Sequence, residues 1–148
     1  MSLKKRLQED WKQALKSKDK FKANTISMAR AAVLLVEKTD GKQLDDEQVT
    51  DILAKEVKQR REAILEFKKG NRQDLVDDTE KEIKILLDYL PQQLSKEEIT
   101  EIVDQAVNEV GANSIKDMKK VMAYVVPKTK GRADGRLVGQ IVKQYLNK

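Results

Sequence analysis

Residues 89–98 read YLPQQLSKEE, and this stretch divides the chain into two helical parts. A helix is expected to end before Pro91, because the residue that precedes a proline avoids the helical region. A new helix is expected to begin at Ser95, which forms a capping box with Glu98: each of these side chains accepts a hydrogen bond from the other residue's backbone N–H. Two domains are therefore predicted. They are residues 1–93 and residues 94–148.

Upstream of this stretch, apolar residues recur at spacings of three and four, which predicts four amphipathic helices. The first covers about 3–15, and the second covers about 21–36 and is predicted to be the most buried, because it has few polar residues late in its length. The third begins at the N-cap Asp45 and ends at Gly70-Asn71, which are expected to supply left-handed residues. The fourth runs from about 75 to 90.

Downstream, the same periodicity predicts three shorter helices. The first covers about 99–110 and ends at Gly111, the second begins near Ser114 and stops at Pro127, and the last is capped by Asp134. Strand patterns are close to absent. The fold class predicted from the sequence is all-α, with an N-terminal long-helix hairpin or bundle domain followed by a small C-terminal three-helix domain.

The chain contains no histidine and no cysteine. It therefore has no Ser-His-Asp or Cys-His nucleophile arrangement and no tetrahedral zinc site of the usual ligands. We expect no catalytic residue, no cofactor and no metal. The absence of cysteine fits a reducing compartment, and the sequence shows neither an apolar signal core nor a run long enough to span a membrane. A cytoplasmic location and no membrane partner are expected.

Charge is unevenly distributed along the chain. Residues 95–112 carry one basic and five acidic side chains, residues 113–148 carry nine basic and two acidic, and the first 94 residues carry twenty basic and eighteen acidic. Because the net charges are −4, +7 and +2, the positive field is expected at the C-terminal end. The nine basic residues there are Lys116, Lys119, Lys120, Lys128, Lys130, Arg132, Arg136, Lys143 and Lys148.

The segment PKTKGRADGR, residues 127–136, places four basic residues among small ones that allow close backbone approach. A basic face of this kind suits the phosphate backbone of RNA, although on composition alone a solvated loop and helix surface is the simpler explanation. Since Asp134 is expected to occupy the helix N-cap, a phosphate should be contacted by side chains and not by the helix N-terminus. The predicted RNA-binding residues are Lys128, Lys130, Arg132, Arg136 and Lys143.

Other candidate sites have simpler explanations. Tyr145 lies on an apolar stripe and is expected in the core, whereas Tyr124 is expected on the polar side, where it is available to pack or to stack on a base. The cluster KQRRE at 58–62 is interpreted as a solvated helix face. Carboxylates between 77 and 82 are interpreted as helix charge patterning, because nothing supplies a convergent third metal ligand.

The chain resembles the stand-alone YqeY proteins of the GatB/YqeY family over essentially its whole length. The segments that carry the resemblance are, in chain order, KQRR at 58–61, DYLPQQL at 88–94, DMKKVM at 117–122, Pro127 and GRADGRLV at 131–138. Two positions depart from the family pattern, in which glycine is expected where this chain has Lys119 and Ala123. These departures weaken the prediction for the helix that begins near Ser114 more than for the segment 128–136.

This resemblance implies a relation to the B subunit of the glutamine-dependent aspartyl/glutamyl-tRNA amidotransferase, a carbon–nitrogen ligase with glutamine as the amide donor. The same helical module forms the tail of that subunit and is associated with gripping tRNA, while the chemistry belongs to other domains and subunits. The resemblance therefore implies tRNA binding and supplies no catalytic residue for this chain.

Three hypotheses follow from the sequence. The first is an accessory protein that binds tRNA or another structured RNA through its C-terminal module, without DNA specificity. The second is a helical adaptor that binds an amidotransferase or a translation component without RNA contact, and it predicts an exposed apolar patch on the C-terminal unit. The third is an enzyme acting in its own right.

Overall fold

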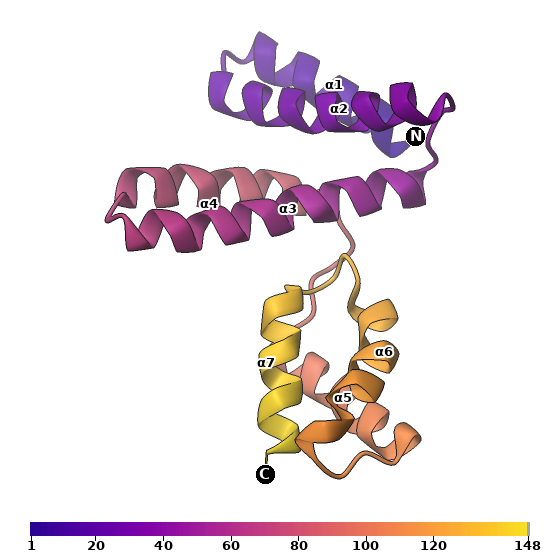
Figure 1. The fold of residues 1–148 in the computed structure, drawn as a ribbon. Helices are drawn as coiled ribbons and strands as arrows, with labels where there is room; N and C mark the ends of the chain where they lie inside the picture. The colour runs from indigo at the N-terminus through magenta and orange to yellow at the C-terminus, as the bar shows by residue number, and fades with distance from the viewer. Residues whose placement is uncertain (148) are drawn as a thin grey trace. The chain divides into compact units, whose positions relative to one another are not determined.

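A computed structural model describes residues 1–147, and these residues form helices joined by short connections, without a strand (Figure 1). The predicted all-α fold class is confirmed. The α-helices are α1 (Leu3–Lys16), α2 (Lys20–Asp40), α3 (Asp46–Lys69), α4 (Gln73–Leu87), α5 (Lys96–Val110), α6 (Met118–Thr129) and α7 (Gly135–Leu146), and a short 3₁₀ turn, η1 (Ile115–Asp117), precedes α6. Contacts group the chain into two units, Met1–Leu90 and Pro91–Lys148. Lys148, one of the nine basic residues counted above, lies outside the described residues.

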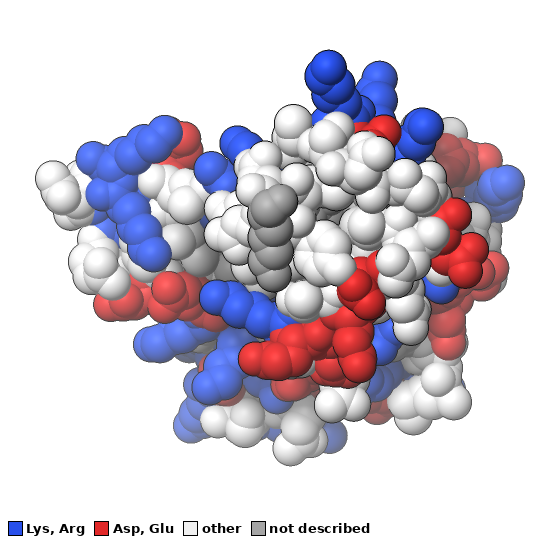
Figure 2. All heavy atoms as spheres, turned by 90° about the horizontal axis from the view of Figure 1, so that it is seen from below, with Lys and Arg blue, Asp and Glu red and all other residues white. Residues whose placement is uncertain are grey.

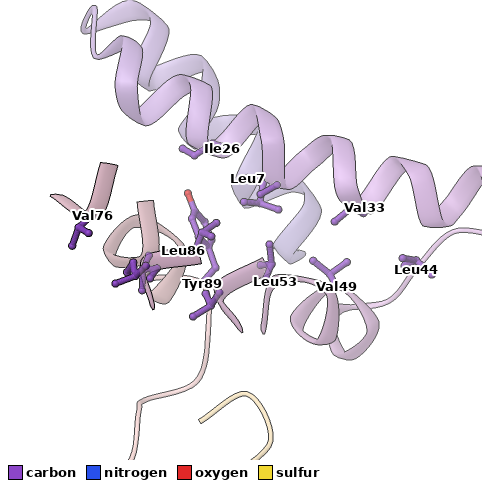
Figure 3. Packing of buried hydrophobic residues seen from close by; sticks show 13 residues of the cluster. Leu7, Ile26, Val33, Leu44, Val49, Leu53, Val76, Leu86 and Tyr89 are labelled. Carbon is purple, nitrogen blue, oxygen red and sulfur yellow. The ribbon is translucent and has the colours of Figure 1, made fainter. Parts of the chain in front are cut away.

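The first unit consists of two helical hairpins, α1 with α2 and α3 with α4, and α2 packs against both helices of the second hairpin (Figure 1). Apolar side chains from all four helices point toward one another in its core (Figure 3). Leu7, Ile26, Leu53 and Leu86 are at most 1% exposed. Burial of each such side chain stabilises the fold by about 1.5–3 kcal/mol, so this core is the main source of stability in the unit.

The start of α3 follows the sequence-based prediction. Asp45 Oδ1 accepts a hydrogen bond from the Gln48 backbone N–H at 2.9 Å, and Gln48 Oε1 accepts one from the Asp45 N–H at 3.0 Å. The predicted end of α3 is only half right. Asn71 is left-handed, with φ 57°, whereas Gly70 has φ −86° and is an ordinary C-cap.

The expectation that α2 would be the most buried helix is wrong. Its buried residues lie on the side that packs against the other three helices, but Met28, Leu34 and Leu35 are about half exposed or more. The sequence of α2 has apolar residues on opposite faces of one helix, and only one of these faces has a neighbour within the unit.

Arg60 corrects the interpretation of residues 58–62 as a solvated face. Its side chain is only 11% exposed and lies between two carboxylates, Glu56 on α3 and Glu82 on α4. Nη1 of Arg60 is 3.2 Å from Glu56 Oε1, and its Nε is 3.5 Å from Glu82 Oε1. The second contact lies within ion-pair range but lacks hydrogen-bond geometry, so it is electrostatic. Lys58 and Gln59 are exposed as expected.

In the second unit, α5, α6 and α7 pack pairwise around a core of their own. The predicted capping box begins α5: Ser95 Oγ accepts from the Glu98 N–H at 3.1 Å, and Glu98 Oε1 accepts from the Ser95 N–H at 3.0 Å. Gly111 ends α5 in the left-handed conformation, with φ 69°. The fully buried core residues are Ile99, Val103, Ala106, Val121, Val125, Val138 and Val142.

The predicted stop of the second C-terminal helix at Pro127 is wrong, because α6 continues through this proline to Thr129. Pro127 lies in the last turn of the helix, where a missing N–H removes one hydrogen bond without interrupting a longer ladder. Thr129 is 5% exposed and its hydroxyl donates to the Val125 carbonyl at 3.1 Å. Burial of Val125 and Thr129 on one face therefore keeps the last turn helical.

Candidate nucleic-acid interface

The turn between α6 and α7 carries two of the five predicted RNA-binding residues, Lys130 and Arg132, and its backbone is tied to the segment before α5. The Leu94 N–H donates to the Arg132 carbonyl at 2.7 Å, and the Gln93 side-chain amide donates to the Gly131 carbonyl at 3.0 Å. Gly131 has φ 73°, a conformation that glycine adopts without strain. These contacts fix the backbone of the turn, and therefore the Cα positions from which its side chains extend.

The structure places Lys128, Lys130, Arg132 and Arg136 around this turn, with Lys143 farther along α7. Lys128, Lys130, Arg136 and Lys143 are exposed and Arg132 is half-buried. Arg136 and Lys143 are seven residues apart on α7, so they share a face and lie about 10 Å apart along the helix axis. The turn thus brings four of the predicted residues together, and Lys143 extends the group along α7.

Asp134 acts as the N-cap of α7, as predicted. Its Oδ1 accepts a hydrogen bond from the Arg136 backbone N–H at 3.0 Å. The carboxylate therefore occupies the position at which a helix N-terminus would bind an anion. Any phosphate at this turn has to be bound by the lysine and arginine side chains.

Lys128 and Arg132 are partly engaged within the unit. Nζ of Lys128 lies 4.7 Å from the centroid of the Tyr124 ring, a cation–π distance. Hydrogen bonds with the Ser95 backbone and hydroxyl lower the pKa of Glu98 from its ordinary value, and the positive charge of Arg132 lowers it further. Arg132 is therefore near one carboxylate, whereas no ion pair within the described residues involves Arg136 or Lys143.

Tyr124 is half-buried against the core of the second unit, and Lys128 covers one face of its ring. Tyr145 is also half-buried in that core, and its hydroxyl donates to Asp104. This hydrogen bond and burial raise the pKa of Tyr145. Both rings are thus engaged in packing, which leaves cations as the groups best placed to contact a nucleic acid.

Acidic residues of the second unit gather on α5, where Glu97, Glu98, Glu101, Asp104 and Glu109 are all exposed. The basic residues lie on η1, α6, the turn and α7, and Lys116, Lys119 and Lys120 are exposed at the start of this segment. Figure 2 shows both charges on the face that it presents, with the lysine and arginine side chains in separate groups and not in one continuous patch. The positive charge on this face is therefore divided among separate groups.

Within the part of the chain that the structure describes, no three or more Asp or Glu side chains are grouped as a metal site would require. None of the described helices is both long enough and apolar enough to cross a membrane. The exposed apolar face of α2 in the first unit was not predicted from the sequence as a binding surface. The seven-residue spacing of its large apolar residues was the available signal.

Comparison with known proteins identifies relatives over almost the whole chain. The family model described as "Yqey-like protein" matches residues 4–146. The "Altered inheritance of mitochondria protein 41, mitochondrial" of Lachancea thermotolerans is 31% identical, with 96% of this chain and 80% of the relative covered. Proteins of the same name are 30% identical in Pyrenophora tritici-repentis, with 95% and 79% covered, and 35% identical in Kluyveromyces lactis, with 70% and 58% covered.

The names of these relatives describe mitochondrial proteins, which contradicts the cytoplasmic location expected from the sequence. The expectation rested on two absences, of cysteine and of an apolar signal core. Neither absence separates the cytoplasm from the interior of a mitochondrion, because an apolar core marks secretory signals only. The expectation of a cytoplasmic location is therefore withdrawn.

Proposed function

Because the chain belongs to the YqeY-like family, we propose that it is a non-catalytic accessory protein that binds structured RNA, and tRNA in particular, through the basic residues around its α6–α7 turn. In this proposal it works beside a glutamine-dependent tRNA amidotransferase or another translation component. It contributes binding and performs no step of a carbon–nitrogen ligase reaction.

The observation that supports this proposal is the grouping of four cations on and beside a turn with a fixed backbone. Lys130 and Arg132 extend from a loop held by the Gln93 and Leu94 hydrogen bonds, and Lys128 and Arg136 lie on the helices at its two ends. A turn with an ordered backbone loses little further backbone entropy when its side chains meet a polyanion. The same arrangement on a mobile loop would bind more weakly for an equal number of contacts.

A folded RNA is a better ligand for this surface than an unstructured strand. Single-strand binding relies on aromatic faces that stack on bases, and here one face of Tyr124 is covered by Lys128. Duplex RNA is recognised mainly through its shape and its backbone phosphates. The turn and the adjoining helices offer exposed cations at several positions, which suits contact with such a backbone.

The test is the affinity for total tRNA of charge-neutralised variants, measured by filter binding across a salt series. Each lost phosphate contact should weaken binding and reduce the slope of log K against log salt by about one. For the triple variant Lys128→Gln, Arg136→Gln, Lys143→Gln, the slope of log K against log salt is therefore expected to be smaller by about three. Arg132→Ala is measured separately, because Arg132 is half-buried and lies near Glu98.

Lys96→Gln provides the matched control, since it removes one positive charge from the same unit at an exposed position on acidic α5. It should change the slope by much less than Arg136→Gln does. If the triple variant keeps the affinity and the slope of the parent chain, the proposed interface is wrong.

The second candidate function is a protein adaptor without RNA contact. It predicts an exposed apolar patch on the second unit. Among the described residues of that unit, the strongly exposed large apolar side chains are Ile115 and Val126. The larger apolar surface is on α2 of the first unit. An adaptor would therefore use the first unit, and truncating the α2 side chains would abolish partner binding without any effect on tRNA.

A further inference from the structure

The outward face of α2 contains no charged residue over most of its length. Seven residues between positions 21 and 37 are exposed, and all seven are uncharged. By contrast, the exposed positions of α1 and α3 are mostly lysine, arginine, aspartate or glutamate, and charged residues form 37% of the chain. The seven residues, which we call the α2 stripe, are Phe21, Asn24, Ser27, Met28, Ala31, Leu34 and Leu35.

Three of the large apolar side chains of the α2 stripe are evenly spaced along the helix. Phe21, Met28 and Leu35 are seven residues apart, so they lie on one face of the helix, and they are 37%, 49% and 66% exposed. Lys81 of α4 lies over Phe21, with its Nζ 5.9 Å from the ring centroid, and the Phe21 residue remains 37% exposed. The spacing is symmetric about Met28.

We propose that the α2 stripe is the interface of a homodimer in which two α2 helices pack antiparallel, with the two-fold axis at Met28. In this arrangement Met28 meets its own copy, and Phe21 of each chain meets Leu35 of the other. Ser27 and Ala31, beside Met28, are small enough for the two helices to approach closely at the axis.

A second copy of the chain is the occupant that the pattern favours. A two-fold interface presents the same surface from both partners, so the pattern of residues must be complementary to itself. A charge at the axis would face an identical charge, and the chain has a net charge of +5. The positions of Phe21, Met28 and Leu35 are symmetric about Met28 and the α2 stripe is uncharged, whereas the nearest exposed charges on α2 are Lys20 and Lys38, one beyond each end of the stripe.

The size of the stripe predicts a weak dimer. The span 21–35 is about 21 Å long, and a helix pair of this length buries on the order of 800 Å² over both copies. Stable complexes usually bury at least about 1,200 Å², so association in the range of tens to hundreds of micromolar is expected. The lysines at the two ends repel across the interface, so added salt should strengthen the dimer.

The first test is the mass of the full chain by sedimentation equilibrium, from about 5 to about 500 µM, a range set by the weak interface expected for its size. The weight-average mass should rise from the monomer value of 16.9 kDa toward twice that value, and it should rise further at high salt. Met28→Lys should weaken association at least tenfold. Val126→Lys is the matched control, because it places the same charge at an equally exposed apolar position of α6, and it should leave association unchanged.

The second test uses the absence of cysteine from the chain, which makes single-cysteine variants clean probes. Met28→Cys should form an intermolecular disulfide rapidly on mild oxidation, because the two positions meet at the axis. Asn24→Cys is the control on the same face: two copies of position 24 lie about 12 Å apart along the helices, beyond the roughly 7 Å that a disulfide spans. A mixture of Phe21→Cys and Leu35→Cys chains should give the mixed disulfide.

Three results would each overturn the proposal: a monomer throughout the concentration range, equal association of Met28→Lys and the parent chain, or equal rates of cross-linking at positions 28 and 24. Association that salt weakens would also contradict it, because it would indicate that the copies meet through opposite charges and not through the uncharged α2 stripe. None of these outcomes depends on RNA, so failure of the dimer leaves the proposed function untouched, and failure of tRNA binding leaves the dimer untouched.

Discussion

Replacing Glu82 by glutamine is expected to destabilise the first unit, although Glu82 belongs to an ordinary-looking run of helix charges. The side chains of Arg60, Glu56 and Glu82 are 11%, 19% and 21% exposed, so this group is largely shielded from water. Two carboxylates share one guanidinium, and the contact with Glu82 joins α3 to α4.

The size of the effect follows from two opposing contributions. At 3.5 Å between Nε and Oε1, the attraction is about 5 kcal/mol at an effective dielectric constant of about 20. Desolvation of the two charges offsets most of this attraction. Because Arg60 retains Glu56 when Glu82 is neutralised, a net loss of about 1–2 kcal/mol is expected for Glu82→Gln. Arg60→Gln leaves two shielded carboxylates without a cation and should lose about 2–3 kcal/mol.

Trp11 is the chain's single tryptophan and packs against the core of the first unit, so its fluorescence in a urea titration reports this unit alone. With a slope of about 1–2 kcal/mol per molar, Glu82→Gln should lower the midpoint by about 1 M. The control is Glu66→Gln on α3, whose ion pair with Lys69 is about three-quarters exposed and should contribute less than about 0.5 kcal/mol. Equal midpoint shifts for Glu82→Gln and Glu66→Gln would refute this account of Arg60.

Two further predictions concern a carboxylate bridge and a helix cap. Hydrogen bonds from the Lys4 ammonium at 2.6 Å and the Leu44 N–H at 2.9 Å lower the pKa of Glu37 from its ordinary value of 4.5. The ionised Glu37 carboxylate therefore contributes fully to stability above pH 4.5, and this contribution is lost as the pH falls through the lower pKa of the folded state. Urea titrations followed by Trp11 fluorescence between pH 7 and pH 3 should therefore show that Glu37→Gln loses less stability on acidification than the parent chain does. An equal loss would contradict a stabilising role for the Glu37 carboxylate between Lys4 and Leu44. Ser95→Ala removes the acceptor of the Glu98 N–H and should cost about 1 kcal/mol in the second unit, seen as faster amide exchange in the first turn of α5, whereas Ser95→Asp should restore protection.

The helix starts were predictable because they depend on contacts within four residues. The capping boxes at Asp45 and Ser95 form in the structure with the predicted partners. Side-chain acceptors at these positions satisfy backbone N–H groups that have no partner in the helix, which makes the signal local. The cap at Asp134 was predictable for the same reason.

The helix ends and the buried faces were less predictable, because tertiary packing decides them. The proline rule placed a stop at Pro127, but burial of Val125 and Thr129 continues α6 past it. Hydrophobicity alone ranked α2 as the most buried helix, although a residue such as Leu35 is 66% exposed. A helix with two apolar faces looks more buried than it is when its neighbours cover only one of them.

The candidate site was predictable as a set of residues but not as a geometry. The sequence segment 127–136 identified the cations, whereas the hydrogen bonds of Gln93 and Leu94 to the turn join residues 38 positions apart. No local pattern encodes that contact. The contact between Lys128 and the Tyr124 ring could be expected from the sequence, because residues four positions apart lie on one face of a helix.

The distribution of charge also changes how salt dependence should be interpreted. Residues 113–148 have a net charge of +7, but residues 1–42 carry eleven basic and five acidic side chains, a net charge of +6. Residues 43–94 carry nine basic and thirteen acidic side chains, a net charge of −4. This negative charge offsets most of the positive charge of the α1–α2 hairpin, so the first 94 residues together have a net charge of only +2. A polyanion is therefore attracted to both units, and the salt slope of the parent chain combines the two. Only the difference between variants that remove the same charge from different surfaces, such as Arg136 and Lys96, assigns a phosphate contact to the α6–α7 turn.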